Sequence, residues 1–130
     1  MNILVIGGSF GGLTVAYDLR RRLRKHDCRI TVIAKERRFI FIPSLPWVAM
    51  GKKSIADISF DLERPLERKG ISFVEDAVLR IDPEQGKVHT GSDSHDYDHL
   101  VIATGHRSAN EAVPGLGPFD GPGHSLMSPP

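Results

Sequence analysis

The sequence is short of cysteine, of net charge and of long apolar runs. Among its 130 residues Cys28 is the single cysteine. This excludes an intramolecular disulfide, a CxxC redox pair and a multi-cysteine metal site, and it suits a reducing compartment. The formal net charge of +1 gives no reason to expect a nucleic-acid partner. Because the apolar start is too short for a signal peptide or a spanning helix, we expect a soluble, cytoplasmic protein.

What the sequence does contain is a glycine-rich turn close to its N-terminus. Four consecutive apolar residues, Ile3–Ile6, predict a strand buried on both faces of a parallel sheet. The turn follows at once, and the spacing of apolar residues over 11–26 then predicts an amphipathic helix.

The turn fits the G-x-G-x-x-G pattern of dinucleotide-binding proteins, apart from its middle glycine. Gly7 would allow the tight turn, Gly12 would let the helix pack close to the strand, and Ser9 occupies the slot that approaches a pyrophosphate. The helix N-terminus would face the phosphates. We therefore expect dinucleotide binding by Gly7, Gly8, Ser9, Phe10, Gly11 and Gly12. The alternative is an ordinary glycine-rich turn without a ligand.

A second strand, Arg29–Ala34, completes a β-α-β unit. An acidic side chain at the end of this strand usually binds the adenosine ribose. Ala34 and Lys35 stand there instead, and Glu36 follows. Ribose recognition would come from the backbone, from Glu36, or from Lys35 with the pair Arg37 and Arg38.

The rest of the chain continues an α/β pattern. We expect an irregular apolar loop over 39–51, a helix over 55–69, a third parallel strand over 71–74, and antiparallel strands over 77–81 and 87–90. The loop would form the floor of an aromatic cofactor pocket or pack in the core. Pro65 would either kink the helix or begin a second one.

Two polar segments and a final strand remain to be interpreted. The segment 91–98 is rich in Asp and His, but its spacing matches no metal site, and we expect a solvated loop without a metal. The basic run 20–25 is interpreted as the solvated end of a helix, with a nucleic-acid or membrane patch as the alternative. A final strand beginning at Leu100 ends in Ala103, Thr104 and Gly105, where the chain could pass close to a nucleotide.

The motifs together resemble the N-terminal FAD-binding part of the flavoproteins with two dinucleotide-binding domains. Within these the chain is most similar to sulfide:quinone oxidoreductases, with type II NADH dehydrogenases as near relatives. The resemblance covers essentially the whole chain. It rests on Gly7–Gly12, Phe41–Gly51, Lys69–Phe73, Ile81–Pro83, Tyr97–Gly105 and Val113–Gly115.

The resemblance implies a Rossmann-type parallel sheet with flanking helices and a small antiparallel meander. It also implies FAD as the cofactor. The pyrophosphate would lie against Gly7–Gly12 and the ribose against residues 34–36. The remaining contacts would be Val78 with the adenine, Pro43 with the isoalloxazine edge, and Ala103–Gly105 with the inner side of the nucleotide.

The resemblance further implies sulfide oxidation, with electrons passing through FAD to a membrane quinone. Met127 stands where the family has a cysteine near the flavin, and a thioether cannot form a thiolate. We therefore name no catalytic residue in this chain.

We expect an incomplete flavoprotein: an FAD-binding portion, 1–112, followed by a Pro/Gly-rich linker or truncated tail, 113–130. Such a portion would be inactive alone, would contact a membrane only within the complete protein, and could self-associate through an uncovered apolar face. The alternatives are a relative of NADH:quinone reductases and a non-catalytic interaction module.

Overall fold

The computed structural model describes residues 1–23, 27–106, 109 and 112. The chain divides into two compact units. The first contains Met1–Phe39 and Asp61–Gly105, and the second contains Ile40–Phe60 and His106–Pro130.

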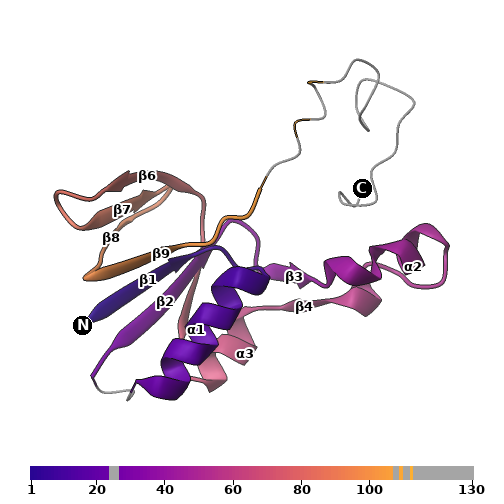
Figure 1. Ribbon diagram of the computed structural model, residues 1–130, viewed down its shortest axis with the longest axis horizontal. Coiled ribbons are helices and arrows are strands. Elements are labelled where there is room, and N and C mark those ends of the chain that lie inside the picture. The colour runs from indigo at the N-terminus through magenta and orange to yellow at the C-terminus, as the bar shows by residue number, and fades with distance from the viewer. Residues whose placement is uncertain (24–26, 107–108, 110–111, 113–130) are drawn as a thin grey trace. The chain divides into compact units, whose positions relative to one another are not determined.

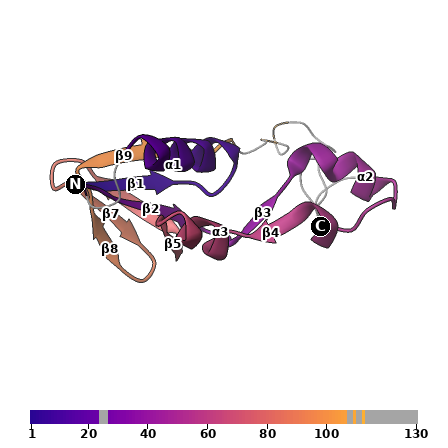
Figure 2. The ribbon, with the colours of Figure 1, turned by 90° about the horizontal axis from the view of Figure 1, so that it is seen from below.

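The first unit is built on a parallel sheet, as expected from its continuous apolar runs. Its strands are β1 (Asn2–Ile6), β2 (Arg29–Ala34), β5 (Ser72–Glu75) and β9 (His99–Ile102), in the order β5-β2-β1-β9. The β1 and β2 residues after the first of each strand are buried. Figures 1 and 2 show helices on one face of this sheet and a meander of strands on the other.

The helices of the first unit are α1 (Phe10–Arg22) and α3 (Glu63–Arg68). Their apolar side chains pack on one face of the sheet because they recur at helical spacing. This core contains Ile3, Val5, Leu13, Ala16, Ile30, Val32, Leu62, Leu66 and Ile71, among others. The expected helix over 11–26 is confirmed for its described part up to Arg22, where three arginines occupy the last turn and complement the helix dipole.

The opposite face is covered by an antiparallel meander of β6 (Val78–Asp82), β7 (Lys87–Thr90) and β8 (Ser94–Asp96). A second core, with Leu4, Ile6, Ile33 and Val88 buried, lies on this side. The expectation of a solvated loop over 91–98 is wrong for β8, which pairs with β7 through Lys87↔Asp96. Short edge strands tolerate polar and charged residues, so no apolar alternation marks this strand.

The expected helix over 55–69 is also wrong. That segment begins with a single 3-10 turn (Ala56–Ile58), continues as strand β4 (Ser59–Asp61), and becomes helical only in α3. Ile58, Leu62 and Leu66 are buried at helical spacing, but they belong to a 3-10 turn, to the residue before α3 and to α3 itself. Pro65 lies in the first turn of α3, in agreement with the alternative that it begins a helix.

In the second unit, the segment expected as an irregular loop contains short regular elements. A 3-10 turn (Ile42–Ser44) leads into α2 (Leu45–Ala49). Strand β3 (Arg38–Ile40), which begins in the first unit, pairs with β4. The apolar side chains divide, since Leu45 is buried while Trp47 and Met50 are exposed.

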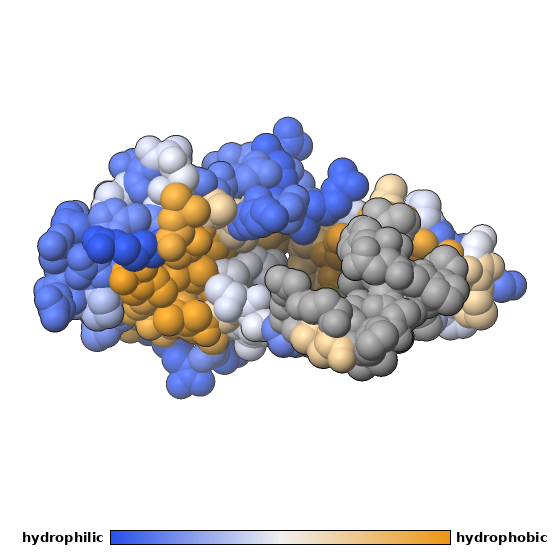
Figure 3. All heavy atoms as spheres, turned by 90° about the horizontal axis from the view of Figure 1, so that it is seen from above, coloured by the Kyte–Doolittle hydropathy of each residue, from blue (hydrophilic) through white to orange (hydrophobic). Residues whose placement is uncertain are grey.

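Figure 3 shows apolar side chains gathered in one area over the first unit. The two most exposed large apolar side chains of this unit are Leu79 on β6 and Ile102 on the edge strand β9. Self-association through an apolar face stays a prediction that light scattering can check. Among the described residues no helix is long and apolar enough to cross a membrane.

The junction between β1 and α1 depends on two glycines. Gly7 has φ of +118°, which favours glycine, and a Cβ there would lie 2.2 Å from the Ala103 carbonyl oxygen. A Cβ on Gly12 would lie 1.9 Å from the Gly7 carbonyl oxygen. Neither obstacle is a flexible side chain, because both oxygens belong to the backbone. The first turn of α1 therefore rests directly on the end of β1.

The exit of β5 is fixed by the carboxylate of Asp76. It accepts hydrogen bonds from the Ala77 N–H (2.7 Å), the Ser92 N–H (2.9 Å) and the Ser92 hydroxyl (2.6 Å). Hydrogen bonds from the side chains of Ser92 and Thr90, together with those backbone amides, hold the pKa of Asp76 well below its ordinary range. One side chain thus ties the end of β5 and the start of β6 to the turn after β7.

We predict that Gly12→Ala destabilises the fold while Gly11→Ala does not. The added methyl at Gly12 has no space, and overpacking of this kind costs about 1–3 kcal/mol or more. At Gly11 the nearest atom would be the Ala103 Cβ at 3.7 Å, and alanine favours a helix by about 1 kcal/mol over glycine. Denaturant unfolding of both variants checks this, and equal stability would contradict the close contact.

We predict that Asp76→Asn lowers the melting temperature at pH 7, because the amide offers a donor to groups that already donate. A depressed pKa contributes stability above the ordinary aspartate pKa, and that stability is lost as the pH falls through the folded value. The difference from wild type should therefore shrink below about pH 4. Asp96→Asn, at an exposed ion pair with Lys87, is the control. Calorimetry at pH 7 and below about pH 4 measures the melting temperatures. A difference between variant and wild type that does not change with pH would contradict the prediction.

Candidate functional site

The carboxyl ends of β1, β2 and β9 meet the N-terminus of α1 at one edge of the sheet. The Gly7 N–H donates to the Ile33 carbonyl (2.9 Å), and the Ala103 N–H donates to the Ile6 carbonyl (2.8 Å). In open α/β sheets ligands bind outside this edge. The structure thus brings the glycine turn, the end of β2 and the end of β9 together, as the sequence predicts.

The glycine turn leaves little space between its backbone and its surroundings. A Cβ on Gly8 would lie 2.7 Å from the Leu62 Cδ1 and 2.9 Å from the Ala34 Cβ. The turn is therefore packed against β2 and against the residue that precedes α3.

Ser9 is the N-cap residue of α1, with an extended backbone. Its side chain makes no capping hydrogen bond, and no acidic residue lies in the first helical turn. The positive end of the helix dipole is therefore not compensated by a side chain of its own first turn. Such a terminus can accept an anion.

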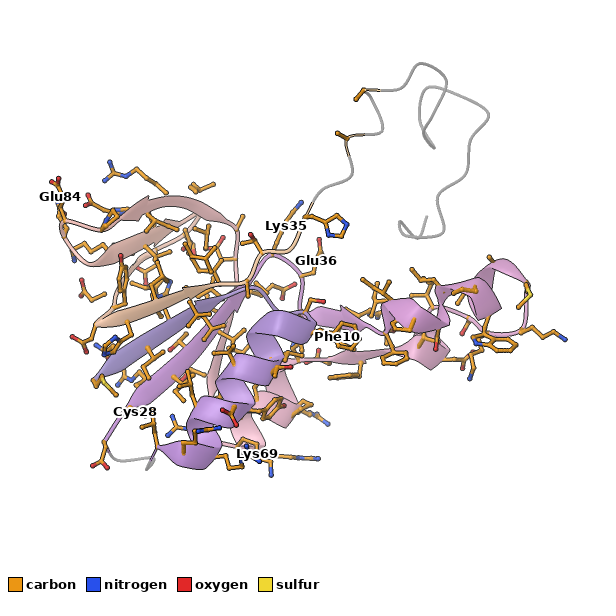
Figure 4. The ribbon with its side chains drawn as sticks, viewed as in Figure 1. Phe10, Cys28, Lys35, Glu36, Lys69 and Glu84 are labelled. Carbon is orange, nitrogen blue, oxygen red and sulfur yellow. The ribbon has the colours of Figure 1, made fainter. Side chains whose placement is uncertain are left out.

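Phe10 is the first residue of α1 and is about half exposed. Its ring packs edge-on against Phe39, with ring centroids 5.1 Å apart and planes at 72°. The contact with Phe39 fixes the Phe10 side chain at the start of α1 (Figure 4).

The end of β2 carries no carboxylate, as the sequence shows. Ala34 is buried and its Cβ faces Gly8, while Lys35 and Glu36 are exposed. Figure 4 shows both charged side chains at the carboxyl edge of the sheet. Neither side chain forms an ion pair with any residue that the structure describes.

Arg37, which the sequence offered as a ribose contact, is held by carboxylates. Its Nε lies 2.7 Å from Asp61, a second nitrogen contacts Glu63, and Nη1 lies 3.9 Å from Glu75. The hydrogen bond to Asp61 and the charges around it raise the pKa of Arg37 above its ordinary value. Of the three cations that the sequence offers for ribose recognition, Lys35, Arg37 and Arg38, Arg37 is already paired with carboxylates of the protein.

Val78, the expected adenine contact, is the first residue of β6 and is half-buried. It stands two residues after Asp76, whose N–H donates to the Ala34 carbonyl (2.9 Å). The start of β6 is therefore tied to the end of β2. At the end of β9, Ala103 is half-buried, while Thr104 and Gly105 are exposed.

The remaining expected residues lie elsewhere. Pro43 belongs to the 3-10 turn of the second unit, so its expected position beside a flavin stays a prediction. Met127 lies outside the described residues. Cys28 is buried at the amino end of β2, where the Arg20 Nη2 donates to its carbonyl (3.1 Å). No group of three acidic, His or Cys side chains in the described part of the chain could hold a metal ion.

Sequence reasoning missed two residues at this edge. Asp76 anchors the chain between β5 and β6, and Glu75 is paired in register with Ala34. The pattern D-A-V after an apolar run could have suggested a turn at Asp76. Nothing in the sequence alone indicates which residue of β5 lies beside Ala34.

Comparison with known proteins agrees with this geometry. The sequence model of the family described as pyridine nucleotide-disulphide oxidoreductase matches residues 1–128. The chain is 40% identical over 105 residues to a sulfide-quinone reductase of Aquifex aeolicus, covering 80% of this chain and 24% of that protein. It is 27% identical over 114 residues to a type II NADH:quinone oxidoreductase of Staphylococcus aureus, covering 88% and 28%.

Solved structures give the same result. A sulfide:quinone oxidoreductase from Aquifex aeolicus superposes with a TM-score of 0.76 at 40% identity, over 82% of this chain and 24% of that one. An NAD-dependent persulfide reductase from A. fulgidus also gives 0.76, at 31% identity, over 88% and 24%.

The chain thus spans about a quarter of the length of the relatives it matches. The family match nevertheless extends over nearly all of its residues and includes the glycine turn, β2 and β9. The resemblance inferred from the sequence motifs is confirmed, and the chain belongs to the pyridine nucleotide-disulphide oxidoreductase family.

Proposed function

We propose that this chain is the FAD-binding portion of an oxidoreductase that resembles sulfide:quinone oxidoreductase. The observation that carries the proposal is the glycine turn, in which Gly7, Gly8 and Gly12 have no room for a Cβ. A turn built of main chain at a helix N-terminus is what a pyrophosphate requires. The 40% identity to the Aquifex aeolicus sulfide-quinone reductase supports the choice of enzyme class.

The contacts proposed with FAD are those expected from the sequence. The main chain of Gly7–Gly12 would hold the pyrophosphate, helped by the uncompensated dipole at Ser9. The segment 34–36 would lie at the ribose, Val78 at the adenine, and Ala103–Gly105 along the inner side of the nucleotide. Pro43 would meet the isoalloxazine edge. When bound, FAD supplies two-electron redox chemistry.

This chain contributes binding and orientation to that chemistry. The described residues offer main-chain donors and a packed edge of the sheet, and we assign no proton transfer or nucleophile to them. Sulfide as electron donor, quinone as acceptor and any peripheral membrane contact belong to the proposal for the complete protein.

A second candidate is a relative of the NADH:quinone oxidoreductases. The similarity to the Staphylococcus aureus enzyme favours it, as does Met127 in place of a cysteine, because reduction of a flavin by NADH needs no thiolate. The segment Pro46-Trp47-Val48 favours the sulfide enzymes instead. A third candidate, a non-catalytic module, would not retain the flavin at all.

We predict that the purified chain retains visible flavin absorbance after incubation with FAD and desalting, and that Ser9→Asp lowers FAD affinity about tenfold or more. A carboxylate at the helix N-terminus would repel the pyrophosphate. The same substitution should leave stability unchanged or higher by about 0.3–1 kcal/mol, because it complements the helix dipole.

Ser94→Asp, which places the same charge on the exposed strand β8, is the control for Ser9→Asp. Absorbance titration measures binding, and thermal unfolding measures stability. A wild-type protein that takes up no FAD would contradict the proposal and favour the non-catalytic module. Equal FAD affinity in Ser9→Asp and Ser94→Asp would contradict the proposed position of the pyrophosphate at the α1 N-terminus.

We predict that neither sulfide nor NADH bleaches the FAD-loaded chain faster than it bleaches free FAD under anaerobic conditions, because we assign no nucleophile to this chain. Free FAD at the same concentration, mixed with each donor, is the control. Rapid bleaching by NADH and none by sulfide would reverse the choice between the two enzyme classes.

A further inference from the structure

The ribose end of the site lacks its usual acidic residue on β2, and the sheet brings another carboxylate to that place. We propose that Glu75, at the end of β5, accepts the hydrogen bonds of the adenosine ribose hydroxyls. The proposal rests on the proposed binding of FAD and identifies a residue that decides its ribose specificity.

The register of the sheet carries the inference. β2 and β5 are parallel, and Ala34 is paired with Glu75. Paired residues of parallel strands direct their side chains to the same face, and neighbouring strands lie about 4.8 Å apart. Glu75 therefore replaces, one strand further out, the acid that Ala34 cannot supply.

The face is the correct one for a nucleotide. Ile30 and Val32 of β2 and Ile71 and Phe73 before Glu75 all pack in the core beneath α1 and α3. Alternation along the strands then places Ala34 and Glu75 on this same side. Since Ala34 faces Gly8 of the glycine turn, Glu75 lies on the side of the sheet where α1 begins.

The carboxylate of Glu75 is available to a ligand. Its side chain is 44% exposed, and among the described residues its one ion-pair contact is the Arg37 Nη1 at 3.9 Å. Arg37 makes its closer contacts with Asp61 and Glu63. Arg37 thus keeps a positive charge near Glu75 without occupying both of its oxygens.

The backbone that carries Glu75 is also fixed on both sides. Val74 is paired with Ile33 before it, and the Asp76 N–H donates to the Ala34 carbonyl after it. The hydrogen bonds of the Asp76 carboxylate to Ala77 and Ser92 hold the chain that follows. A binding group on such a support needs little reordering when a ligand arrives.

Two charged neighbours are the rivals. Glu36 is exposed beyond the end of β2 and could bind the hydroxyls itself. Lys35 would instead favour a phosphate on the ribose, since cations near this position accommodate a 2′-phosphate. Figure 4 shows both at the same edge, so the experiment must separate them from Glu75.

The test compares ADP with 2′-deoxy-ADP by titration calorimetry on the full chain. Because a hydrogen bond to a charged group is a strong one, the wild type should bind ADP about tenfold or more tightly than the deoxy form. In Glu75→Ala the two affinities should become equal. Glu75→Gln, which keeps the size of the side chain, should give an intermediate ratio.

Glu84→Ala is the matched control, because Glu84 is exposed in the turn between β6 and β7, away from the edge (Figure 4). It should keep the wild-type ratio, and circular dichroism establishes that each variant is folded. A Glu75→Ala variant that weakens both ligands equally, and keeps their ratio, would overturn the proposal and leave Glu75 a structural role.

Two further results would overturn it while leaving nucleotide binding intact. In one, Glu36→Ala binds ADP and 2′-deoxy-ADP equally well, while Glu75→Ala still prefers ADP as the wild type does. The other is tighter binding of 2′-phosphorylated ADP than of ADP, abolished by Lys35→Ala. A wild-type protein that binds no ADP would overturn this proposal together with the proposed function.

Discussion

The close contact of α1 with β1 is the constraint on which the first unit depends. With 1.9 Å between the Gly7 oxygen and the place of a Gly12 Cβ, the helix starts directly on the end of the strand. The same contact makes the turn narrow. Packing and the proposed phosphate binding are therefore linked, because the glycines that allow the helix to approach carry no side chain that could cover a phosphate.

The second constraint acts across the sheet. β2 makes three of the connections at this edge. Its Ile33 carbonyl accepts from the glycine turn, and its Ala34 carbonyl accepts from Asp76 after β5. Along its length β2 also pairs with β5. Asp76 then extends this linkage to the meander. The segments expected to meet the pyrophosphate, the ribose and the adenine are thus parts of one hydrogen-bonded edge, although the first and the last lie about 70 residues apart in the sequence.

The parallel sheet, α1 and the glycine turn could be predicted because each leaves a local signal. Buried strands appear as apolar runs, and the helix as a period in its apolar residues. β4 and β8 left no such signal, since three-residue strands with polar residues are stabilised by their partners rather than by their own pattern. The segment 55–69 misled for a related reason: Ile58, Leu62 and Leu66 are buried at helical spacing, but the hydrogen bonds of β4 override that pattern.

The ribose contact shows the same limit at the level of the site. A sequence motif is defined along one strand. On β2 the usual acidic residue is absent, and Ala34 and Lys35 stand in its place. A ligand, however, meets the edge of a sheet, where neighbours in space belong to different strands. Register is a property of strand pairing and of the packed faces, so Glu75 becomes visible only once β5 is aligned with β2. A missing motif residue is therefore weak evidence against a ligand until the adjoining strand ends have been inspected.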